Sequence, residues 1–214
     1  MNVPTKRMAI HKLILDWNGT VMADLDRSWH VTNLLLTDVG APPLTLAQFQ
    51  ERFTLPMARF FADVAVPAYR IADVERRWSE LSATKQAPLA PGARALLERC
   101  RLADVEVGVL TGADPALIRA DAQHHGIDSM LAWVDGPSLD KRHVLAAIAE
   151  RNGEGGVAYV GDTTHDISSA QSAGLISVGV LGGYTPEQRI RAAEPDVVID
   201  ALSSLLPYIP ATKS

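Results

Sequence analysis

Short, mostly apolar runs recur along the chain, and helix-like patterns separate them in its second half. The apolar runs are residues 12–16, 105–110, 157–160, 176–181 and 197–199. Their scarcity of polar positions is typical of strands buried on both faces of a parallel sheet. The helical patterns cover residues 91–102, 115–125, 141–151 and 165–173. This alternation predicts an α/β fold with a doubly wound, Rossmann-like parallel sheet.

The segment between the first apolar run and residue 88 breaks the alternation, because all of its patterns are helical. The helical stretches are residues 25–39, 46–53, 57–64 and 68–84. Prolines at positions 42, 43, 56 and 67 separate them, which predicts several short helices. We therefore expect a core domain formed by residues 1–20 and 89–214, with residues 21–88 inserted as a helical cap.

Length and charge restrict the classes of function. A chain of 214 residues can form one substantial core with a smaller inserted module. Its net charge of -5 gives no electrostatic footprint for nucleic acid or for an anionic membrane. The apolar run near the N-terminus is too short for a signal peptide or a membrane span, so we expect a cytoplasmic protein. We also expect a monomer or a homodimer. Cys100 is the sole cysteine, which excludes an intramolecular disulfide.

Polar residues directly follow three of the predicted strands. These residues are Asp16 at the end of the first strand, Thr111 with Gly112 after the second, and Gly161 with Asp162 after the third. Parallel strands of a doubly wound sheet end at one edge, so we expect these groups to share a site. The Asp16 carboxylate can attack a phosphoryl group. The alternative for Asp16 is a turn in which side chains bond to local amides.

Two carboxylates flank the start of the helix at residues 165–173. Asp162 and Asp166 offer hard oxygen ligands of the kind that Mg²⁺ prefers, and helix capping is the alternative. With Asp16 nearby, three carboxylates would repel one another unless a cation lay between them. The Thr111 hydroxyl and the Gly112 amide precede another helix start and could bind phosphate oxygens, although Thr111 could also be an N-cap.

Lys141 lies at the predicted start of helix 141–151, where the helix dipole disfavours a cation. It could hold the Asp16 carboxylate and a transferred phosphoryl group together. Arg142 is the competing candidate for that role, and a solvated surface lysine is the alternative interpretation.

Four motifs, in this order, resemble the haloacid dehalogenase superfamily of phosphohydrolases over the whole chain. They are Leu-Asp-Trp-Asn-Gly-Thr at 15–20, Leu-Thr-Gly at 110–112, Lys141, and Gly-Asp-Thr-Thr-His-Asp at 161–166. The chain is most similar to the phosphoglycolate phosphatase and β-phosphoglucomutase group, in which a helical cap follows the first motif. The resemblance therefore implies a phosphatase with an inserted cap.

The resemblance also implies roles for the residues at the strand ends. Asp16 would be the nucleophile that forms an aspartyl-phosphate and a ligand of Mg²⁺. The backbone carbonyl of Asn18 and Asp162 would be further ligands, with Asp166 in support. Phosphoryl oxygens would bind to Thr111 and Gly112, and Lys141 would balance charge in the transition state.

Asn18 departs from the resemblance. Phosphatases of this superfamily carry aspartate two residues after the nucleophile, as a general acid and base whose contribution is typically about 10²- to 10⁴-fold in rate. An asparagine there allows three interpretations. The substrate has a good leaving group, such as an acyl phosphate or phosphoanhydride; the protein is a phosphonate hydrolase; or it is a phospho-ligand-binding relative that has lost turnover.

The phosphonate alternative rests on a second resemblance of the first motif, to phosphonoacetaldehyde hydrolase. That enzyme forms a Schiff base through a cap lysine, and residues 21–88 contain only Lys85, next to the return hinge. Phosphate hydrolysis is therefore favoured over phosphonate hydrolysis. A metal-free dehalogenase is disfavoured as well, because Asp162 and Asp166 are better explained around a cation.

Substrate choice is expected to lie in the cap. Arg52 and Arg59 could bind a second anionic group of the substrate, or could be surface residues. For Trp29 and His30 packing is the favoured role, and His165 is expected to be a partly exposed residue at a helix start. The sequence as a whole predicts a Mg²⁺-dependent phosphohydrolase that acts on a small phosphorylated metabolite.

Overall fold

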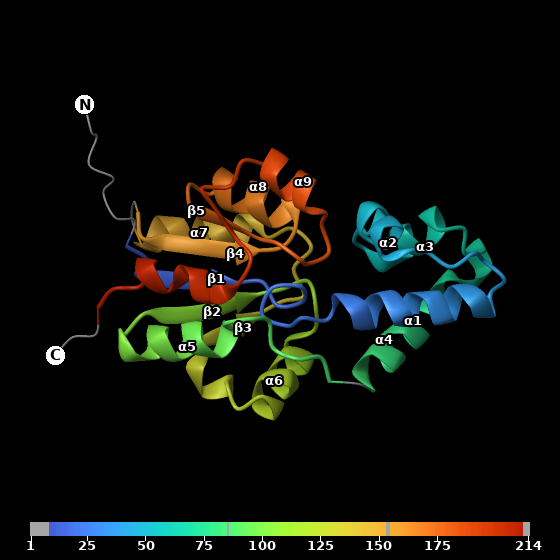
Figure 1. Cartoon of the computed structure of the whole chain (residues 1–214), viewed down its shortest axis with the longest axis horizontal. Helices are drawn as coiled ribbons and strands as arrows, with labels where there is room; N and C mark the ends of the chain where they lie inside the picture. The colour runs from blue at the N-terminus through green and yellow to red at the C-terminus, as the bar shows by residue number, and fades with distance from the viewer. Residues whose placement is uncertain (1–8, 85, 153–154, 212–214) are drawn as a thin grey trace.

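A six-stranded parallel sheet forms the centre of the larger part of the molecule, in a computed structural model that describes residues 9–84, 86–152 and 155–211 (Figure 1). The strands are β1 (Lys12–Leu15), β2 (Glu106–Leu110), β3 (Trp133–Asp135), β4 (Val157–Gly161), β5 (Ile176–Val180) and β6 (Val197–Ile199). Their order is β3-β2-β1-β4-β5-β6, and each neighbouring pair is parallel. This is the order of a doubly wound sheet, which confirms the predicted fold class.

Helices cover both faces of the sheet, which explains why its strands are mostly apolar. The helices of this part are α5 (Ala93–Leu102), α6 (Pro115–His124), η2 (Asp128–Met130), α7 (Arg142–Asn152), α8 (Thr164–Ser172), α9 (Glu187–Ala192) and η3 (Leu202–Tyr208). Side chains of α5, α6 and η3 pack with Leu13 and Leu15 on one face. On the other face, α7 and α8 pack with Ile14 and Tyr159.

The short edge strand β3 was not predicted, and neither were α9 and η3. Strand β3 has only three residues, none of them fully buried, so it lacks the apolar run that marks the other strands. Its place depends on a contact with β2: a Cβ added to Gly108 would lie 2.0 Å from Trp133 Cε2. The Trp133 ring therefore occupies the space that a side chain at position 108 would fill. The sequence pattern does not indicate this contact.

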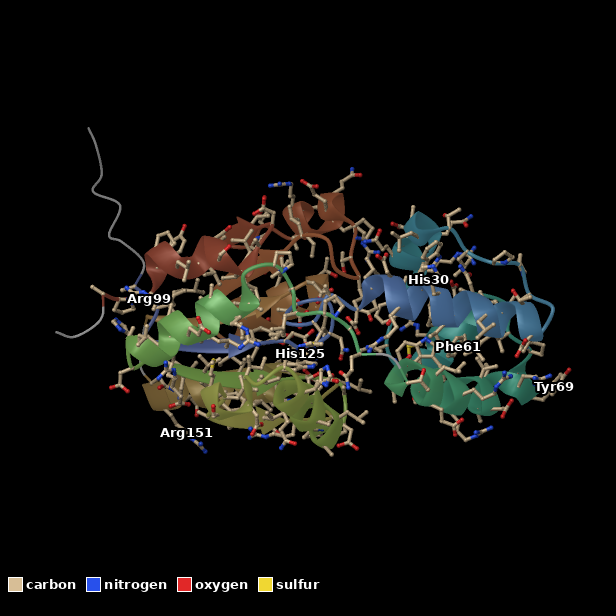
Figure 2. All side chains as sticks on the ribbon, turned by 60° about the horizontal axis from the view of Figure 1, so that its bottom comes forward. His30, Phe61, Tyr69, Arg99, His125 and Arg151 are labelled. Carbon is tan, nitrogen blue, oxygen red and sulfur yellow. The ribbon has the colours of Figure 1, made fainter. Side chains whose placement is uncertain are left out.

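The remaining helices form a separate layered unit beside one end of the sheet (Figure 1). They are α1 (Leu25–Asp38), α2 (Leu46–Arg52), α3 (Met57–Asp63), η1 (Ala68–Arg70) and α4 (Ile71–Ala83). We call this unit the helical insertion. It has its own apolar core, in which Phe61 is fully buried, while Tyr69 at its outer end is 85% exposed (Figure 2).

Two chain segments connect the helical insertion to the sheet, and they run side by side. Met22 and Leu89 form an antiparallel bridge. Ala23 N donates to Pro88 O over 2.9 Å, and Ala90 N donates to the Val21 carbonyl over 2.8 Å. This pairing supports the proposed limits of the inserted unit at residues 21 and 88.

Of the helices in the described part of the chain, none combines the length and apolar character needed to cross a membrane.

Cys100 is expected to be unreactive in the folded protein. Its side chain is fully buried on α5, and burial raises the pKa of the thiol to about 12. Near pH 8 only a fraction on the order of 10⁻⁴ would be thiolate, the form that reacts with a disulfide reagent. A thiol-labelling assay should find slow reaction under native conditions and complete reaction in guanidinium chloride. Rapid labelling of the folded protein would contradict the packing of α5.

Candidate functional site

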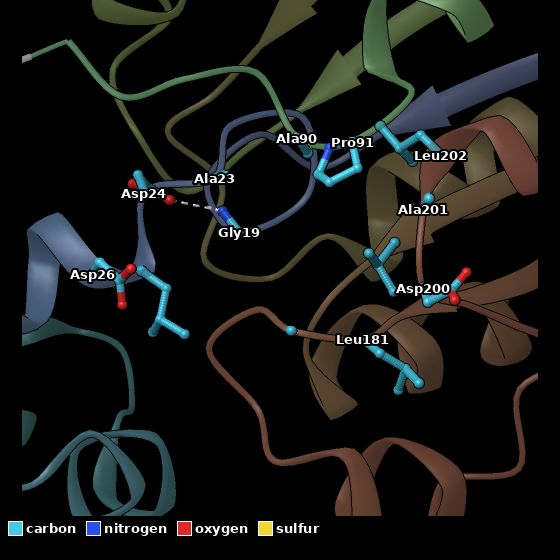
Figure 3. Close-up of a pocket in the computed structure, with 13 residues that line it drawn as sticks. Gly19, Ala23, Asp24, Asp26, Ala90, Pro91, Leu181, Asp200, Ala201 and Leu202 are labelled. Atoms are coloured by element: carbon cyan, nitrogen blue, oxygen red, sulfur yellow. Dashed lines mark hydrogen bonds between the residues drawn. The ribbon is translucent and has the colours of Figure 1, made fainter.

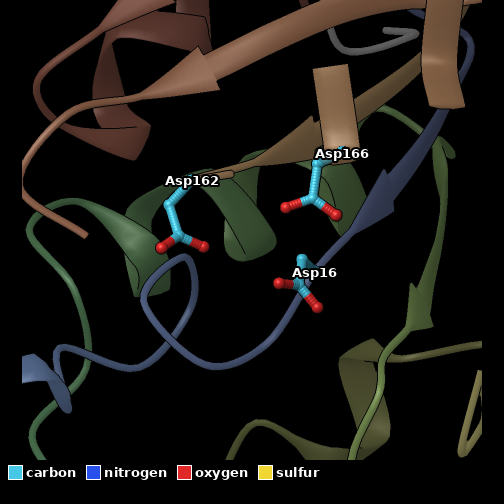
Figure 4. A group of neighbouring side chains, drawn as sticks. All are labelled: Asp16, Asp162 and Asp166. Atoms are coloured by element: carbon cyan, nitrogen blue, oxygen red, sulfur yellow. The ribbon is translucent and has the colours of Figure 1, made fainter. Parts of the chain in front are cut away.

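Three aspartates meet at the carboxyl edge of the sheet (Figure 4). Asp16 directly follows β1, Asp162 directly follows β4, and Asp166 lies in the first turn of α8. One oxygen of each carboxylate lies within 4.8 Å of the others. The residues are 8%, 0% and 1% exposed, in that order. Strands β1 and β4 are neighbours at the point where the strand order reverses, which is where doubly wound sheets bind ligands.

Lys141 is the cation of this cluster. Its Nζ lies 2.9 Å from Asp16 Oδ1 and 2.8 Å from Asp166 Oδ1, and the side chain is buried. Lys141 precedes the first residue of α7 and accepts the Leu145 N–H over 3.0 Å. Arg142, the competing candidate, instead bonds Asp140 on the surface with two contacts of 2.9 Å. The two carboxylates compensate for a cation at a helix start.

Burial and mutual repulsion act on the aspartates in different ways. Burial, with repulsion from Asp166, raises the pKa of Asp16 to about 6 although Lys141 opposes the shift. Burial and the Asp16 charge raise the pKa of Asp162 well above its usual value. Burial also acts to raise the pKa of Asp166, but contacts with Lys141 outweigh it and the pKa is lowered. Burial alone would lower the pKa of Lys141, yet Asp16 and Asp166 raise it.

The donor set therefore fits a hard divalent cation. The cluster has three carboxylates for one ammonium group, and Lys141 contacts Asp16 and Asp166, so the negative charge of the ionised carboxylates exceeds the positive charge. Hard cations such as Mg²⁺ take few carboxylates and relieve this type of repulsion. A cluster of buried carboxylates with excess negative charge can hold a metal ion.

Hydrogen bonds hold the carboxylates of Asp162 and Asp166 in place. Asp162 Oδ1 accepts from Thr20 Oγ1 over 3.0 Å, and Asp162 Oδ2 accepts from Tyr184 N over 2.6 Å. Asp166 Oδ2 accepts from Thr163 N and Thr163 Oγ1, over 3.1 and 2.6 Å. Thr163 and Asp166 together form a capping box for α8, so Asp166 also has the capping role considered from the sequence.

Thr20, Tyr159 and Tyr184 are residues that the sequence analysis did not single out. The Tyr159 hydroxyl lies 2.9 Å from Asp166 Oδ1 and 3.3 Å from the Leu110 carbonyl oxygen, so it links β4 with the end of β2. Thr20 belongs to the first motif, and this position was a reason to consider it a site residue. The contact of Tyr184 with Asp162 depends on the path of the loop after β5, which the sequence pattern does not give.

The end of β2 places Thr111 and Gly112 next to the helical insertion. Thr111 is buried, and its Oγ1 accepts the Ala113 N–H over 3.2 Å, so the hydroxyl proton is still available to a ligand. A Cβ added to Gly112 would lie 3.5 Å from Leu55 Cδ1. Leu55, and neither Arg52 nor Arg59, is therefore the side chain of the insertion that lies against Gly112.

The two arginines proposed for substrate binding lie on the surface of the insertion. Arg52 is 3.9 Å from Asp63 in a half-exposed ion pair, and Arg59 is exposed. Substrate binding by either residue stays a prediction.

The remaining candidates have simple surroundings. Trp29 packs in the insertion and donates from Nε1 to the Leu44 carbonyl over 2.7 Å. The exposed His30 has Nδ1 at 2.6 Å from the Asp26 carbonyl oxygen, and His165 is exposed. Lys85 lies outside the described residues.

Asn18 is held by a carboxylate that the sequence analysis did not consider. Its Nδ2 donates to Asp24 Oδ2 over 2.7 Å, and Asp24 is 1% exposed. Asp24 also lines a cavity of about 140 Å³ between the loop after β1, the start of α1 and the segment before η3 (Figure 3). Asp16, Asp162 and Asp166 do not line this cavity, which is therefore separate from the carboxylate cluster.

Gly19 is expected to tolerate no side chain. A Cβ there would lie 2.3 Å from Asp162 Oδ2, and its φ is +75°. Gly40 is a matched control, because its φ is +74° and nothing lies within 4 Å. Both alanine variants incur the strain of a left-handed backbone, and only Gly19→Ala adds a clash. We therefore expect the free energy of unfolding of Gly19→Ala, measured with denaturant, to fall by about 1–3 kcal/mol more than that of Gly40→Ala. Equal losses would contradict the close approach of Asp162.

Known proteins resemble this chain over most of its length. A sequence model of the haloacid dehalogenase-like hydrolases matches residues 13–180. Phosphoglycolate phosphatase of Synechococcus elongatus is 29% identical over 204 residues, which cover 91% of this chain and 94% of that protein. Phosphoglycolate phosphatase of Xanthomonas campestris is 28% identical over 185 residues, with 80% and 83% covered.

Solved structures share the fold. A predicted phosphoglycolate phosphatase from Haemophilus somnus has a TM-score of 0.80 at 19% identity, over 92% of this chain and 96% of that chain. A haloacid dehalogenase-like family hydrolase from Streptococcus pneumoniae has a TM-score of 0.78 at 19% identity, over 93% and 98%. Since the family match spans most of the sequence, the chain belongs to the haloacid dehalogenase-like hydrolases and is a hydrolase of the phosphatase type.

Proposed function

We propose that the protein is a Mg²⁺-dependent phosphatase that hydrolyses a small phosphorylated metabolite through an aspartyl-phosphate at Asp16. The observation that carries this proposal is the position of Asp16 at the carboxyl edge of the sheet, in contact with the Lys141 ammonium and beside two further carboxylates. The names of the curated relatives support a small phosphate-bearing substrate.

The proposed metal ligands come from the loop after β1 and from the carboxylate cluster. Asp16, Asp162 and the backbone carbonyl of Asn18 would hold Mg²⁺, with Asp166 in support. When bound, the ion neutralises negative charge on the phosphoryl oxygens. This charge neutralisation and in-line positioning are the main requirements of phosphoryl transfer.

The side chains of the protein then perform a two-step displacement. An Asp16 carboxylate oxygen attacks phosphorus, and the bond from phosphorus to the leaving oxygen breaks. Water next attacks the aspartyl-phosphate, which releases inorganic phosphate and restores the carboxylate. Lys141, the Thr111 hydroxyl and the Gly112 N–H bind the phosphoryl oxygens, and they stabilise the charge of the transition state.

Phosphate release from a panel of esters, acyl phosphates and nucleotides tests the proposal. We expect turnover of at least one substrate with Mg²⁺, loss of turnover with a chelator, and recovery when Mg²⁺ is restored. Mg²⁺ alone should raise the melting temperature, because it binds the folded carboxylate cluster. Full turnover in the presence of chelator would refute the metal requirement. No phosphate release from any substrate would refute the activity and favour a binding protein.

A further inference from the structure

Asp24 is a buried carboxylate at the start of α1 that binds the loop carrying Asn18. Its Oδ1 accepts the Gly19 N–H over 2.8 Å (Figure 3). Its Oδ2 accepts from Asn18 Nδ2 over 2.7 Å, from Arg27 Nη2 over 3.1 Å and from the Tyr184 hydroxyl over 3.1 Å. Both oxygens of Asp24 therefore hold the two residues that follow Asp16 and Trp17 in the loop.

These contacts determine the orientation of the Asn18 amide. If the amide rotated by half a turn, Asn18 Oδ1 would face Asp24 Oδ2, and two acceptors at that distance repel. Nδ2 therefore stays with Asp24, which leaves Oδ1 and the second Nδ2 hydrogen to meet a ligand. The amide oxygen accepts a hydrogen bond and the remaining N–H can donate one, but neither group transfers a proton.

Lys141 does not replace the missing proton donor. Its ammonium is held between Asp16 and Asp166 at 2.9 and 2.8 Å, and both carboxylates stabilise its protonated form. Departure of the leaving group then depends on its own basicity. A carboxylate, with a pKa near 4, leaves as an anion, whereas an alkoxide needs a proton.

We propose that Asp24 is a positioning residue that fixes the orientation of the Asn18 amide, and that this pair directs hydrolysis to acyl phosphates. The substrate class rests on the proposed phosphatase function. In the first step Asp16 displaces a carboxylate from phosphorus, and no proton moves. In the second step water displaces the Asp16 carboxylate, and both protons of the water leave on inorganic phosphate.

The pair can be exchanged by mutation, which makes the proposal testable. Asn18→Asp alone places two carboxylates at the 2.7 Å contact, and repulsion should displace the loop. Asp24→Asn alone leaves two amides there, and the charge that holds the loop is lost. In the double variant an amide at position 24 can accept the Gly19 N–H with its oxygen and donate to a carboxylate at position 18.

The experiment compares the four proteins of this cycle, with exposed Asp26→Asn as the control. Kinetics with acetyl phosphate and 2-phosphoglycolate, in Mg²⁺, give kcat and KM for each protein, after subtraction of spontaneous hydrolysis. Melting temperatures without substrate are measured in parallel. For the wild-type protein we expect kcat/KM to be about 10²-fold or more higher with acetyl phosphate. Asp26→Asn should match the wild type in both assays.

The variants should separate positioning from chemistry. Each single variant should melt about 4 °C or more below the wild type and lose kcat on acetyl phosphate with little change in KM. The double variant should melt above both single variants, although it loses the contact of Arg27 Nη2 with Asp24 Oδ2. It should also raise kcat on 2-phosphoglycolate by about 10²-fold, because it restores an acid at position 18.

Three results would overturn parts of the proposal. If Asn18→Asp alone raised 2-phosphoglycolate turnover without loss of melting temperature, Asp24 would not position residue 18. Equal wild-type rates on the two substrates would refute the acyl phosphate preference. If the wild type turned over neither compound nor any substrate of the panel, the phosphatase function and the substrate class would both fall. In that case, recovery of the melting temperature in the double variant would still show that Asp24 positions residue 18.

Discussion

Asp16→Asn is expected to lower the rate of phosphate release by at least about 10⁴-fold, because it removes the nucleophile. The substitution keeps the size of the side chain and replaces a buried charge by an amide. Lys141 retains its 2.8 Å contact with Asp166, so the variant should remain folded. Phosphate-release kinetics under saturating Mg²⁺ measure the loss, and a melting curve checks the fold.

The control for this variant is Asp26→Asn, the same substitution at an exposed position in the first turn of α1. It should leave the rate within about twofold of the wild type, since surface substitutions change stability little. Substantial turnover by a folded Asp16→Asn protein would show that the nucleophile lies elsewhere, and the mechanism proposed here would be wrong.

Lys141→Met is expected to reduce both stability and activity. Methionine keeps an unbranched side chain of similar length, but it leaves Asp16 and Asp166 buried without their shared cation. Removal of one partner from a buried ion pair typically costs about 3–5 kcal/mol in the free energy of unfolding. Denaturant unfolding in chelator measures this cost. Added Mg²⁺ should recover part of the stability, since it supplies positive charge to the same carboxylates.

Arg142→Met is the matched control for that experiment. Arg142 is the next residue in the chain, and its ion pair with Asp140 is largely exposed, with side chains 60% and 41% accessible. Exposed pairs contribute about 1 kcal/mol or less, so this variant should stay close to the wild type. If the two methionine variants were equally stable, the buried position of Lys141 between the carboxylates would be contradicted.

The positions of Asp16, Thr111 and Asp162 could be predicted because they follow from local pattern and chain direction. Each residue directly follows an apolar run, and parallel strands end at the same edge. The fold class, confirmed by the strand order, rests on the same reasoning. Lys141 was expected at a helix start, but the sequence left Arg142 as a competitor. The choice between them required the path of the chain before α7.

Other features could not be predicted, because they depend on contacts between distant parts of the chain. Strand β3 is too short to carry a periodic signal, and its place depends on the fit of Trp133 over Gly108. The Tyr184 hydroxyl reaches Asp24 from a loop 160 residues later in the sequence. Nothing in the local pattern around either residue indicates that contact.

Asn18 illustrates what the sequence determines and what the tertiary structure determines. The sequence by itself determines that position 18 transfers no proton, because the acidity of an amide is a property of the side chain alone. Only the tertiary structure decides which end of that amide faces Asp24. The fold brings the buried Asp24 carboxylate to 2.7 Å from Nδ2, and repulsion between two acceptor oxygens disfavours the opposite orientation.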